Sequence, residues 1–223
     1  MNKQFFYESL EKKSLLFSAI LNFNLEQHKK TLPYSNLENF LQTDFLTGNT
    51  FKKYQKPSPA LFWDFADETK RLVLLDIQSL VKLARVLGVS LYAEEISHIL
   101  DRKSVLQLQN ELGKELYFYA LERGKFRLHE IKERFKNTDK QLSLIDKVIR
   151  DGEKMLALCT QNWQEELKQI FSQNIQETLP FLAACIQENP NMEMTPAEAR
   201  LIWFSVKKLL FQEVNNSWLP YFN

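Results

Sequence analysis

The chain has 223 residues and a net charge of +1, with 44% hydrophobic and 26% charged residues. This is the composition of an ordinary globular protein, and the near-zero charge argues against a nucleic-acid-binding protein, which is usually strongly basic. Glycine and proline are scarce, at five and seven residues, whereas phenylalanine is abundant at seventeen. Few helix breakers and many large apolar side chains favour helices packed around a bulky core.

The N-terminal region and the two cysteines indicate a protein of the cytoplasm. Apolar residues at helical spacing predict a helix over residues 4–22, but charged residues such as Glu8 and Lys12 interrupt them, unlike in a signal peptide. No apolar run approaches the roughly 18 residues of a membrane span. Cys159 and Cys185 lie far apart in helical stretches without metal-binding spacing. A reducing compartment is therefore a simpler explanation than a disulfide scaffold.

Capping boxes predict the starts of three helices, because a Ser or Thr and a Glu or Gln three residues later can satisfy the first unpaired amides of a helix. The three pairs are Ser35 with Glu38, Thr138 with Gln141, and Thr195 with Glu198. The first helix should end at Gly48, and the third should reach about Val214. The second should extend to Leu156, with Gly152 as a position where it could be interrupted. Two further helices are expected, over residues 160–179 and from Pro180 onward.

The stretch 48–59 is polar, contains two prolines and lacks periodicity, which is typical of a loop or linker. We therefore expect an N-terminal helical segment over residues 1–48, a loop or linker at 49–58 and a main helical domain over residues 59–223. Strand-like alternation appears nowhere. The predicted fold is all-α, a single-chain helical bundle or an orthogonal helical array.

Glycines divide the region 59–124 into predicted short helices. Gly88 and Gly113 each follow an apolar stripe, as a left-handed C-cap does, and Asp101 is the expected N-cap of the helix that ends at Gly113. A third helix should end at Gly124. The first two glycines also share the pattern Leu-Gly-x-x-Leu-Tyr, 25 residues apart. A duplicated helix-turn-helix unit would explain this, but two helices that independently reached the same packing are the favoured explanation.

The residue types that carry catalysis form no recognisable motif. The three histidines lack mutual ligand spacing, the five dispersed glycines form no phosphate-binding loop, and neither cysteine has the local features of an activated nucleophile. Adjacent carboxylates such as Glu94 and Glu95 point about 100° apart on a helix, as on a solvated face. We therefore expect no catalytic residues, no metal site and no cofactor.

Two regions are candidates for contact with a partner. The stretch 123–136 carries six basic residues with two phenylalanines, but interleaved glutamates and an apolar stripe favour a solvated amphipathic helix over an anionic-surface, membrane or RNA site. If this stretch binds anything, an acidic protein is the expected partner. The C-terminal tail with Trp218 either folds back onto the core, the favoured interpretation, or anchors a partner. The candidate contact residues here are Arg127, Lys132, Arg134 and Trp218.

The central segment carries a resemblance to a known family. Leu72–Asp76 is leucine-rich, and Leu80–Gly88 reads Leu-x-x-Leu-Ala-x-x-Leu-Gly. Together these resemble the K component of type III secretion sorting platforms (the YscK, MxiK and OrgA type). Phe23-Asn24 resembles the N-terminal Phe-Asn motif of that family, although Pro33-Tyr34 follows it at a greater distance than is usual there. Leu179-Pro180 resembles the family's C-terminal Leu-Pro.

The resemblance implies a non-enzymatic cytoplasmic adaptor of the injectisome. Such proteins connect the cytoplasmic domain of the inner-membrane ring protein to the C-ring-like platform protein, so they reach the membrane only through partners and need no nucleic acid. Phe23 and Asn24 become candidate contacts for one partner, and the stretch 123–136 for the other. The alternative function is a helical secreted effector or regulatory factor that binds a cellular protein.

Overall fold

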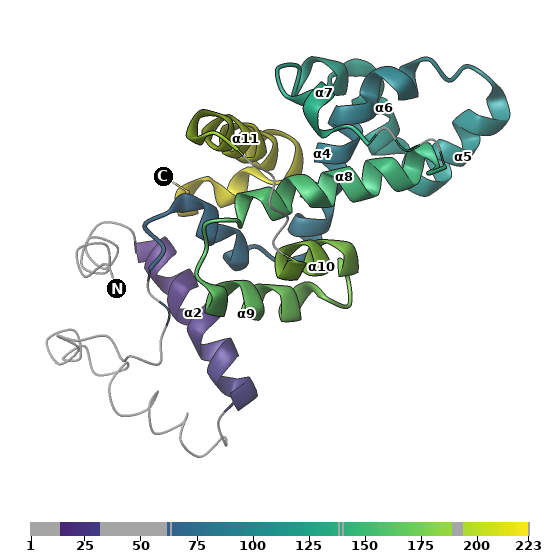
Figure 1. The fold of residues 1–223 in the computed structure, drawn as a ribbon. Helices are drawn as coiled ribbons and strands as arrows, with labels where there is room; N and C mark the ends of the chain where they lie inside the picture. The colour runs from purple at the N-terminus through teal and green to yellow at the C-terminus, as the bar shows by residue number, and fades with distance from the viewer. Residues whose placement is uncertain are drawn as a thin grey trace, which may run out of the picture. The chain divides into compact units, whose positions relative to one another are not determined.

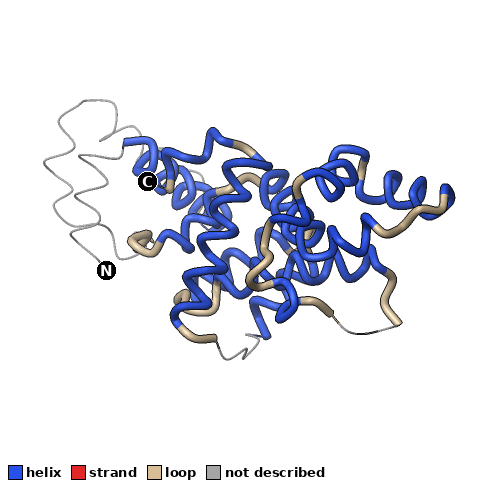
Figure 2. Tube along the Cα trace, turned by 90° about the horizontal axis from the view of Figure 1, so that it is seen from above, coloured by secondary structure: helices blue, strands red, loops and turns tan. Residues whose placement is uncertain are grey.

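The computed structural model describes residues 14–31, 62, 64–137, 139, 141–188 and 194–222, and within them every regular element is a helix (Figures 1 and 2). The predicted all-α fold is confirmed. None of the helices in these ranges combines the length and apolar composition that a membrane crossing needs. The chain divides into unit 1, made of Met1–Leu74 with Pro220–Asn223, and unit 2, made of Leu75–Leu219. This boundary falls later than the expected linker at 49–58, which lies outside the described residues.

Unit 1 contains α2 (Ser14–Thr31) and the 3-10 helix η2 (Glu68–Leu74). The helix expected over 4–22 is therefore described from Ser14 and continues past the expected end, burying Leu16 and Ile20 on one face. The predicted capping box at Ser35 lies outside the described ranges. Arg71 connects two segments of unit 1 that are far apart in the sequence. Its guanidinium donates to the carbonyl oxygens of Phe65 at 3.2 Å and Tyr221 at 3.1 Å. Burial lowers the pKa of Arg71 from its ordinary value.

Unit 2 is organised around α4 (Ile77–Ser97), which is apolar almost all round and therefore buried on most of its faces. Asp76 caps its first turn by accepting a hydrogen bond from the amide of Ser79 at 2.8 Å. The prediction that a helix ends at Gly88 is wrong, since α4 continues for nine residues beyond it. Gly88 serves instead as a point of close approach.

Helix α8 (Leu144–Cys159) packs across α4 (Figure 1). Two glycines, one from each helix, lie at the contact. A Cβ on Gly88 would lie 1.8 Å from the carbonyl oxygen of Val148, and a Cβ on Gly152 would lie 2.0 Å from that of Ala84. Each glycine thus faces a backbone carbonyl of the other helix, which only a residue without a side chain permits. Gly152 does not interrupt α8, although it was a candidate interruption.

Thr138 lies outside the described residues, but the helix predicted to start there starts later, because the first residue of α8 is Leu144. Ser143 is its N-cap, and its hydroxyl oxygen accepts from the amide of Asp146 at 3.1 Å. Before it, the Asn137 side chain accepts from the amide of Asp139, and the Asp139 side chain accepts from that of Gln141, both at 2.8 Å. These side-chain turns compete with helix formation and delay the start of α8.

The two Leu-Gly-x-x-Leu-Tyr sites are not structurally equivalent. Gly113 lies between α5 (Arg102–Leu112) and α6 (Lys114–Glu122) with φ 87°, as a C-cap glycine does, whereas Gly88 lies inside a helix. Asp101 caps α5 as predicted, accepting from the amide of Ser104 at 2.9 Å. The helix before Gly124 ends at Glu122, close to the predicted position.

The C-terminal part of unit 2 follows the prediction most closely. Thr195 and Glu198 form the reciprocal capping box, and Pro180 begins a helix. The helix expected over 160–179 is shorter at both ends. The elements are α9 (Glu165–Ile175), α10 (Pro180–Glu188), α11 (Pro196–Leu209), the π-helical turn η4 (Leu210–Val214) and the 3-10 helix η5 (Asn216–Tyr221), of which Pro220 and Tyr221 belong to unit 1. Helix α10 packs against both α9 and α8.

Candidate partner-binding surface

The basic stretch 123–136 is not the single helix that was expected. It contains a 3-10 turn, η3 (Gly124–Phe126), a bend at Leu128, and one helical turn, α7 (Lys132–Phe135). Leu128 has a φ of 45°, in the left-handed region, so the chain cannot continue as a right-handed helix there. The three residues of the predicted apolar stripe are nonetheless buried as expected: they are Leu128, Ile131 and Phe135.

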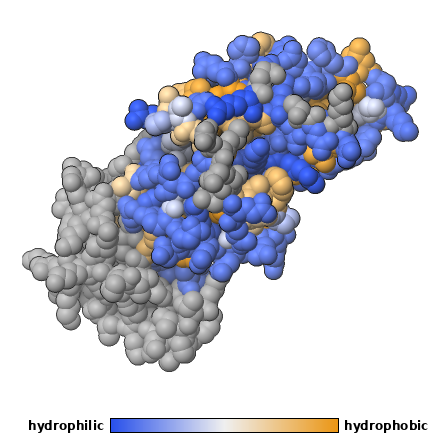
Figure 3. Space-filling model, viewed as in Figure 1, coloured by the Kyte–Doolittle hydropathy of each residue, from blue (hydrophilic) through white to orange (hydrophobic). Residues whose placement is uncertain are grey.

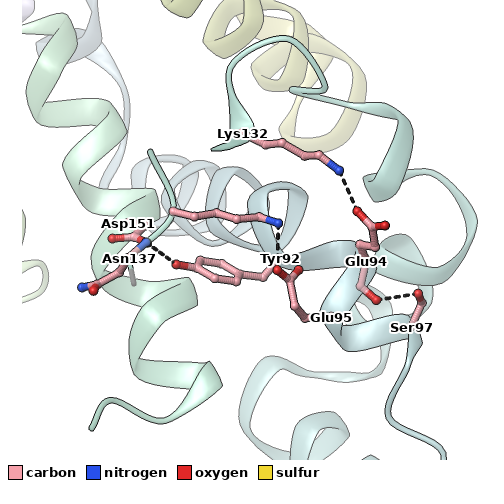
Figure 4. A network of polar contacts seen from close by, with 8 residues as sticks. Tyr92, Glu94, Glu95, Ser97, Lys132, Asn137 and Asp151 are labelled. Carbon is pink, nitrogen blue, oxygen red and sulfur yellow. Dashed lines mark hydrogen bonds and ion pairs between the residues drawn. The ribbon is translucent and has the colours of Figure 1, made fainter. Parts of the chain in front are cut away.

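Ion pairs within the chain fasten this stretch to its neighbours. The Glu213 carboxylate on η4 is only 5% exposed and lies 3.0 Å from Arg127 and 3.2 Å from Arg123. Lys132 pairs with Glu94 of α4 at 2.6 Å, as Figure 4 shows. The remaining pairs are Lys136 with Glu95 at 2.7 Å and Arg134 with Glu198 of α11. Much of the basic character of the stretch is therefore matched by carboxylates of the same chain.

A buried polar cluster secures the end of the stretch (Figure 4). The Tyr92 hydroxyl donates to the carboxylate of Asp151 on α8, and the amide of Asn137 donates to the same carboxylate at 2.7 Å. Burial, and then the hydrogen bond to Asp151, raise the pKa of Tyr92 above its usual range. Because the cluster joins α4, α8 and residue 137, it holds the basic stretch against two helices of the core.

A groove of about 190 Å³ lies between residues 126–131 and α11. Two phenylalanines line it while remaining largely in solvent, Phe126 at 73% exposed and Phe204 at 61%. In Figure 3, apolar atoms gather over the part of unit 2 that carries α11. The groove therefore offers apolar side chains beside a concave surface, which is typical of a protein-binding site.

The charges around the groove are mainly positive. Lys125 lies with its Nζ 5.0 Å from the centre of the Phe126 ring, and Lys208 lines the groove from α11; both are exposed. His129 and Glu130 belong to the wall formed by residues 126–131. Arg127 also lines the groove, and its Nε is buried without a hydrogen-bond acceptor in the part of the chain that the structure describes.

A second hollow, of about 330 Å³, lies between α4, α8 and the first turn of α10. Glu153 of α8 is buried there and accepts a hydrogen bond from the amide of Leu182 at 2.6 Å, so it caps α10 from a neighbouring helix. Burial raises the pKa of this carboxyl, partly offset by the Leu182 hydrogen bond and by Arg85. Arg150 lies 5.6 Å above the Phe181 ring. The groups here serve the packing of α10, and their charges are mixed.

Phe23 and Asn24, predicted as partner contacts, are buried within unit 1. The Asn24 side chain donates to the carbonyl of Phe62 at 2.9 Å and accepts from its amide at 2.7 Å. Phe23 packs edge-on against Phe65 with ring centres 6.0 Å apart. Both residues therefore stabilise the packing of unit 1. That they also contact a partner stays a prediction.

The other predicted contacts divide between two places in unit 2. Arg127, Lys132 and Arg134 lie together on the basic stretch, and only Arg127 of these lines the groove. Trp218 is half-buried and its indole donates to the hydroxyl of Ser79 at 3.2 Å, in line with the expectation that the tail folds back. Sequence reasoning missed Phe204. Its signal was that it falls off the α11 stripe formed by Ile202, Val206 and Leu209, which are all buried.

Comparisons with known proteins add no identity: no family model matches the chain, and neither a curated protein nor a solved structure does. The residues that resemble the sorting-platform family lie in structural positions. Leu80, Leu83 and Leu87 are buried in α4, and Gly88 contacts α8. Such positions specify a helical core.

Proposed function

We propose that the chain is a non-enzymatic adaptor of a type III secretion sorting platform, which links the inner-membrane ring protein to the C-ring-like platform protein. The observation that carries a binding role is the groove between residues 126–131 and α11 with its two exposed phenylalanines. The choice of system rests on the resemblance of the central segment.

The groove suits binding because its walls are already in place. The ion pairs of Arg127 and Arg134 fix one wall to η4 and α11, and the Tyr92–Asp151–Asn137 cluster fixes the end of the same stretch. A partner would then order few protein side chains on binding, which reduces the entropic cost. Large aromatic side chains beside a concavity are the usual energetic centres of interfaces.

An adaptor needs a second surface, because partners that share one face compete. Exposed apolar side chains also occur on α5, on α6 and just before α5, namely Leu106, Phe118 and Leu100. These elements do not line the groove. We therefore assign the groove to one partner and this α5–α6 surface to the other.

The test is affinity capture of the intact chain from its native organism at low salt, followed by identification of the bound proteins. The expected result is co-capture of the ring component and the platform component in one complex. Phe204→Ser should release one of them and Phe118→Ser the other, so that each variant is the control for its counterpart. Both substitutions are at exposed positions and should leave helicity unchanged.

Capture of neither component would refute the adaptor. If the chain were instead secreted and captured a single cellular protein through the groove, the effector function would replace it. Competition between ring and platform components for the unaltered chain would also refute the proposal, since a linker must hold both at once.

A further inference from the structure

We infer that the groove between residues 126–131 and α11 binds an acidic protein segment that inserts one large apolar side chain. This inference rests on the proposed binding function and adds the chemistry of the partner at the same site. It follows from the size of the groove and from the charges around it.

The size of the groove favours a side chain over a small molecule. Small-molecule pockets usually measure roughly 300–1,000 Å³, whereas this groove measures about 190 Å³. Phe126 and Phe204 line the groove and are largely exposed, so a side chain that enters it can contact both rings. An aromatic or aliphatic residue from a partner would bury the exposed parts of both rings and remove apolar surface from water.

The charges favour an acidic partner. Glu213 is nearly buried between Arg123 and Arg127, so it neutralises one guanidinium and leaves a surplus positive charge. Lys125 and Lys208 are exposed beside the groove, and Glu130 is the one carboxylate among the described residues that line it. Carboxylates that flank the inserted side chain would meet these cations, which raises the rate of association and fixes the orientation of the segment.

A protein segment suits this surface better than a membrane or a nucleic acid. A bilayer is flat and would touch the exposed phenylalanines without filling the concavity. A nucleic acid needs a row of cations along its backbone, and here Glu130 and Glu213 lie among the cations.

The test is selection of a phage-displayed library of random 12-residue peptides on the intact chain. The counter-selection uses the double variant Phe126→Ser, Phe204→Ser. We expect enriched peptides that are net negative and carry at least one Phe, Trp, Leu or Ile. The strongest peptide, labelled with a fluorophore, should bind the intact chain with marked salt dependence in fluorescence anisotropy.

The matched charge variants give the second readout. Lys125→Glu with Lys208→Glu should weaken the peptide by about tenfold or more, since both cations lie beside the groove. Lys103→Glu with Lys114→Glu makes the same charge change on exposed lysines of α5 and α6 and should leave the affinity within about twofold. Urea unfolding of all variants checks that they are folded.

Enrichment of neutral or basic peptides, equal binding to the double variant, or no enrichment at all would overturn the inference. So would groove-dependent binding of phosphatidylglycerol vesicles or of a single-stranded oligonucleotide in place of peptides. These outcomes are distinct from failure of the adaptor. A complex with both platform components can persist when acidic peptides do not bind, and acidic peptides can bind a chain that captures neither component.

Discussion

Substituting Gly88 by alanine probes the crossing of α4 and α8 directly. In an exposed helix, alanine is about 0.8–1.0 kcal/mol more favourable than glycine, so propensity alone predicts a more stable protein. At this crossing, however, the added Cβ would lie 1.8 Å from the Val148 carbonyl oxygen. The two atoms would have to separate by about 1.6 Å to reach the 3.4 Å of an ordinary contact.

The obstacle is backbone, so no side-chain rotation can relieve it. Overpacking of this kind costs about 1–3 kcal/mol, occasionally more, and a backbone obstacle belongs at the upper end. After subtraction of the propensity gain, we expect Gly88→Ala to destabilise the protein by about 2 kcal/mol. Gly152→Ala should behave similarly, because its Cβ would lie 2.0 Å from the Ala84 carbonyl oxygen. The double variant should cost less than the sum, since one separation of the helices relieves both clashes.

The measurement is urea unfolding followed by circular dichroism at 222 nm, with the midpoint compared at equal m-value. Gly124→Ala is the matched control, because its nearest neighbours would be the Ala93 Cβ at 3.1 Å and the Tyr119 carbonyl oxygen at 3.3 Å, which are close to ordinary contact distances. It should change the unfolding free energy by less than about 1 kcal/mol. A Gly88→Ala variant as stable as the wild type, or more stable, would mean that the two helices do not cross at these glycines.

Three further predictions concern other contacts. Thr195→Ala should cost about 1 kcal/mol through loss of the N-cap bond to Glu198, and an unchanged urea midpoint would exclude the cap. Burial raises the pKa of Glu153 above the ordinary 4.5, so the folded state holds this proton more tightly and its stability falls as the pH rises from 4.5 through the raised value. The side chain in Glu153→Gln keeps an oxygen that can accept from the Leu182 amide but does not titrate. The unfolding free energy of this variant, measured in urea, should therefore rise relative to that of the wild type as the pH increases, and a relative fall would contradict the prediction. Glu213→Gln should cost about 1–2 kcal/mol, because Arg123 and Arg127 lose a shared partner; an effect no larger than that of Glu130→Gln would contradict it.

Helix starts were predictable where the signal is local. Thr195 with Glu198, Asp101 and Pro180 all begin or cap helices as expected, because a cap depends on residues within one turn. Gly88 shows the limit of such reasoning. The same residue type that ends a helix also permits close approach of two helices, and the deciding partner, Val148, is 60 residues away in the sequence. Before α8, the two side-chain turns of Asn137 and Asp139 and the later cap Ser143 determine where the helix starts.

The candidate site was only partly predictable for the same reason. The basic residues of the stretch 123–136 are evident in the sequence, but their carboxylate partners come from α4, α11 and η4. The groove exists only where residues 126–131 meet α11. Phe126 could be noticed as an aromatic among cations, whereas its proximity to Phe204 depends on tertiary structure.

The ion pairs that hold the basic stretch differ in exposure, so salt should weaken them to different extents. The carboxylate of Glu94 is 56% exposed and that of Glu213 only 5%, so added salt should loosen the Lys132 attachment well before the Arg127 attachment. A salt titration of binding to the groove would then combine two effects, the weaker attraction of the partner and the softening of the wall that receives it. The number of ionic contacts inferred from the slope of affinity against salt concentration would then exceed the number actually formed between the groove and the partner. Repeating the titration with the neutral substitutions Lys125→Gln and Lys208→Gln reduces the attraction of the partner and retains the softening, because neither lysine is part of the ion pairs that hold the wall.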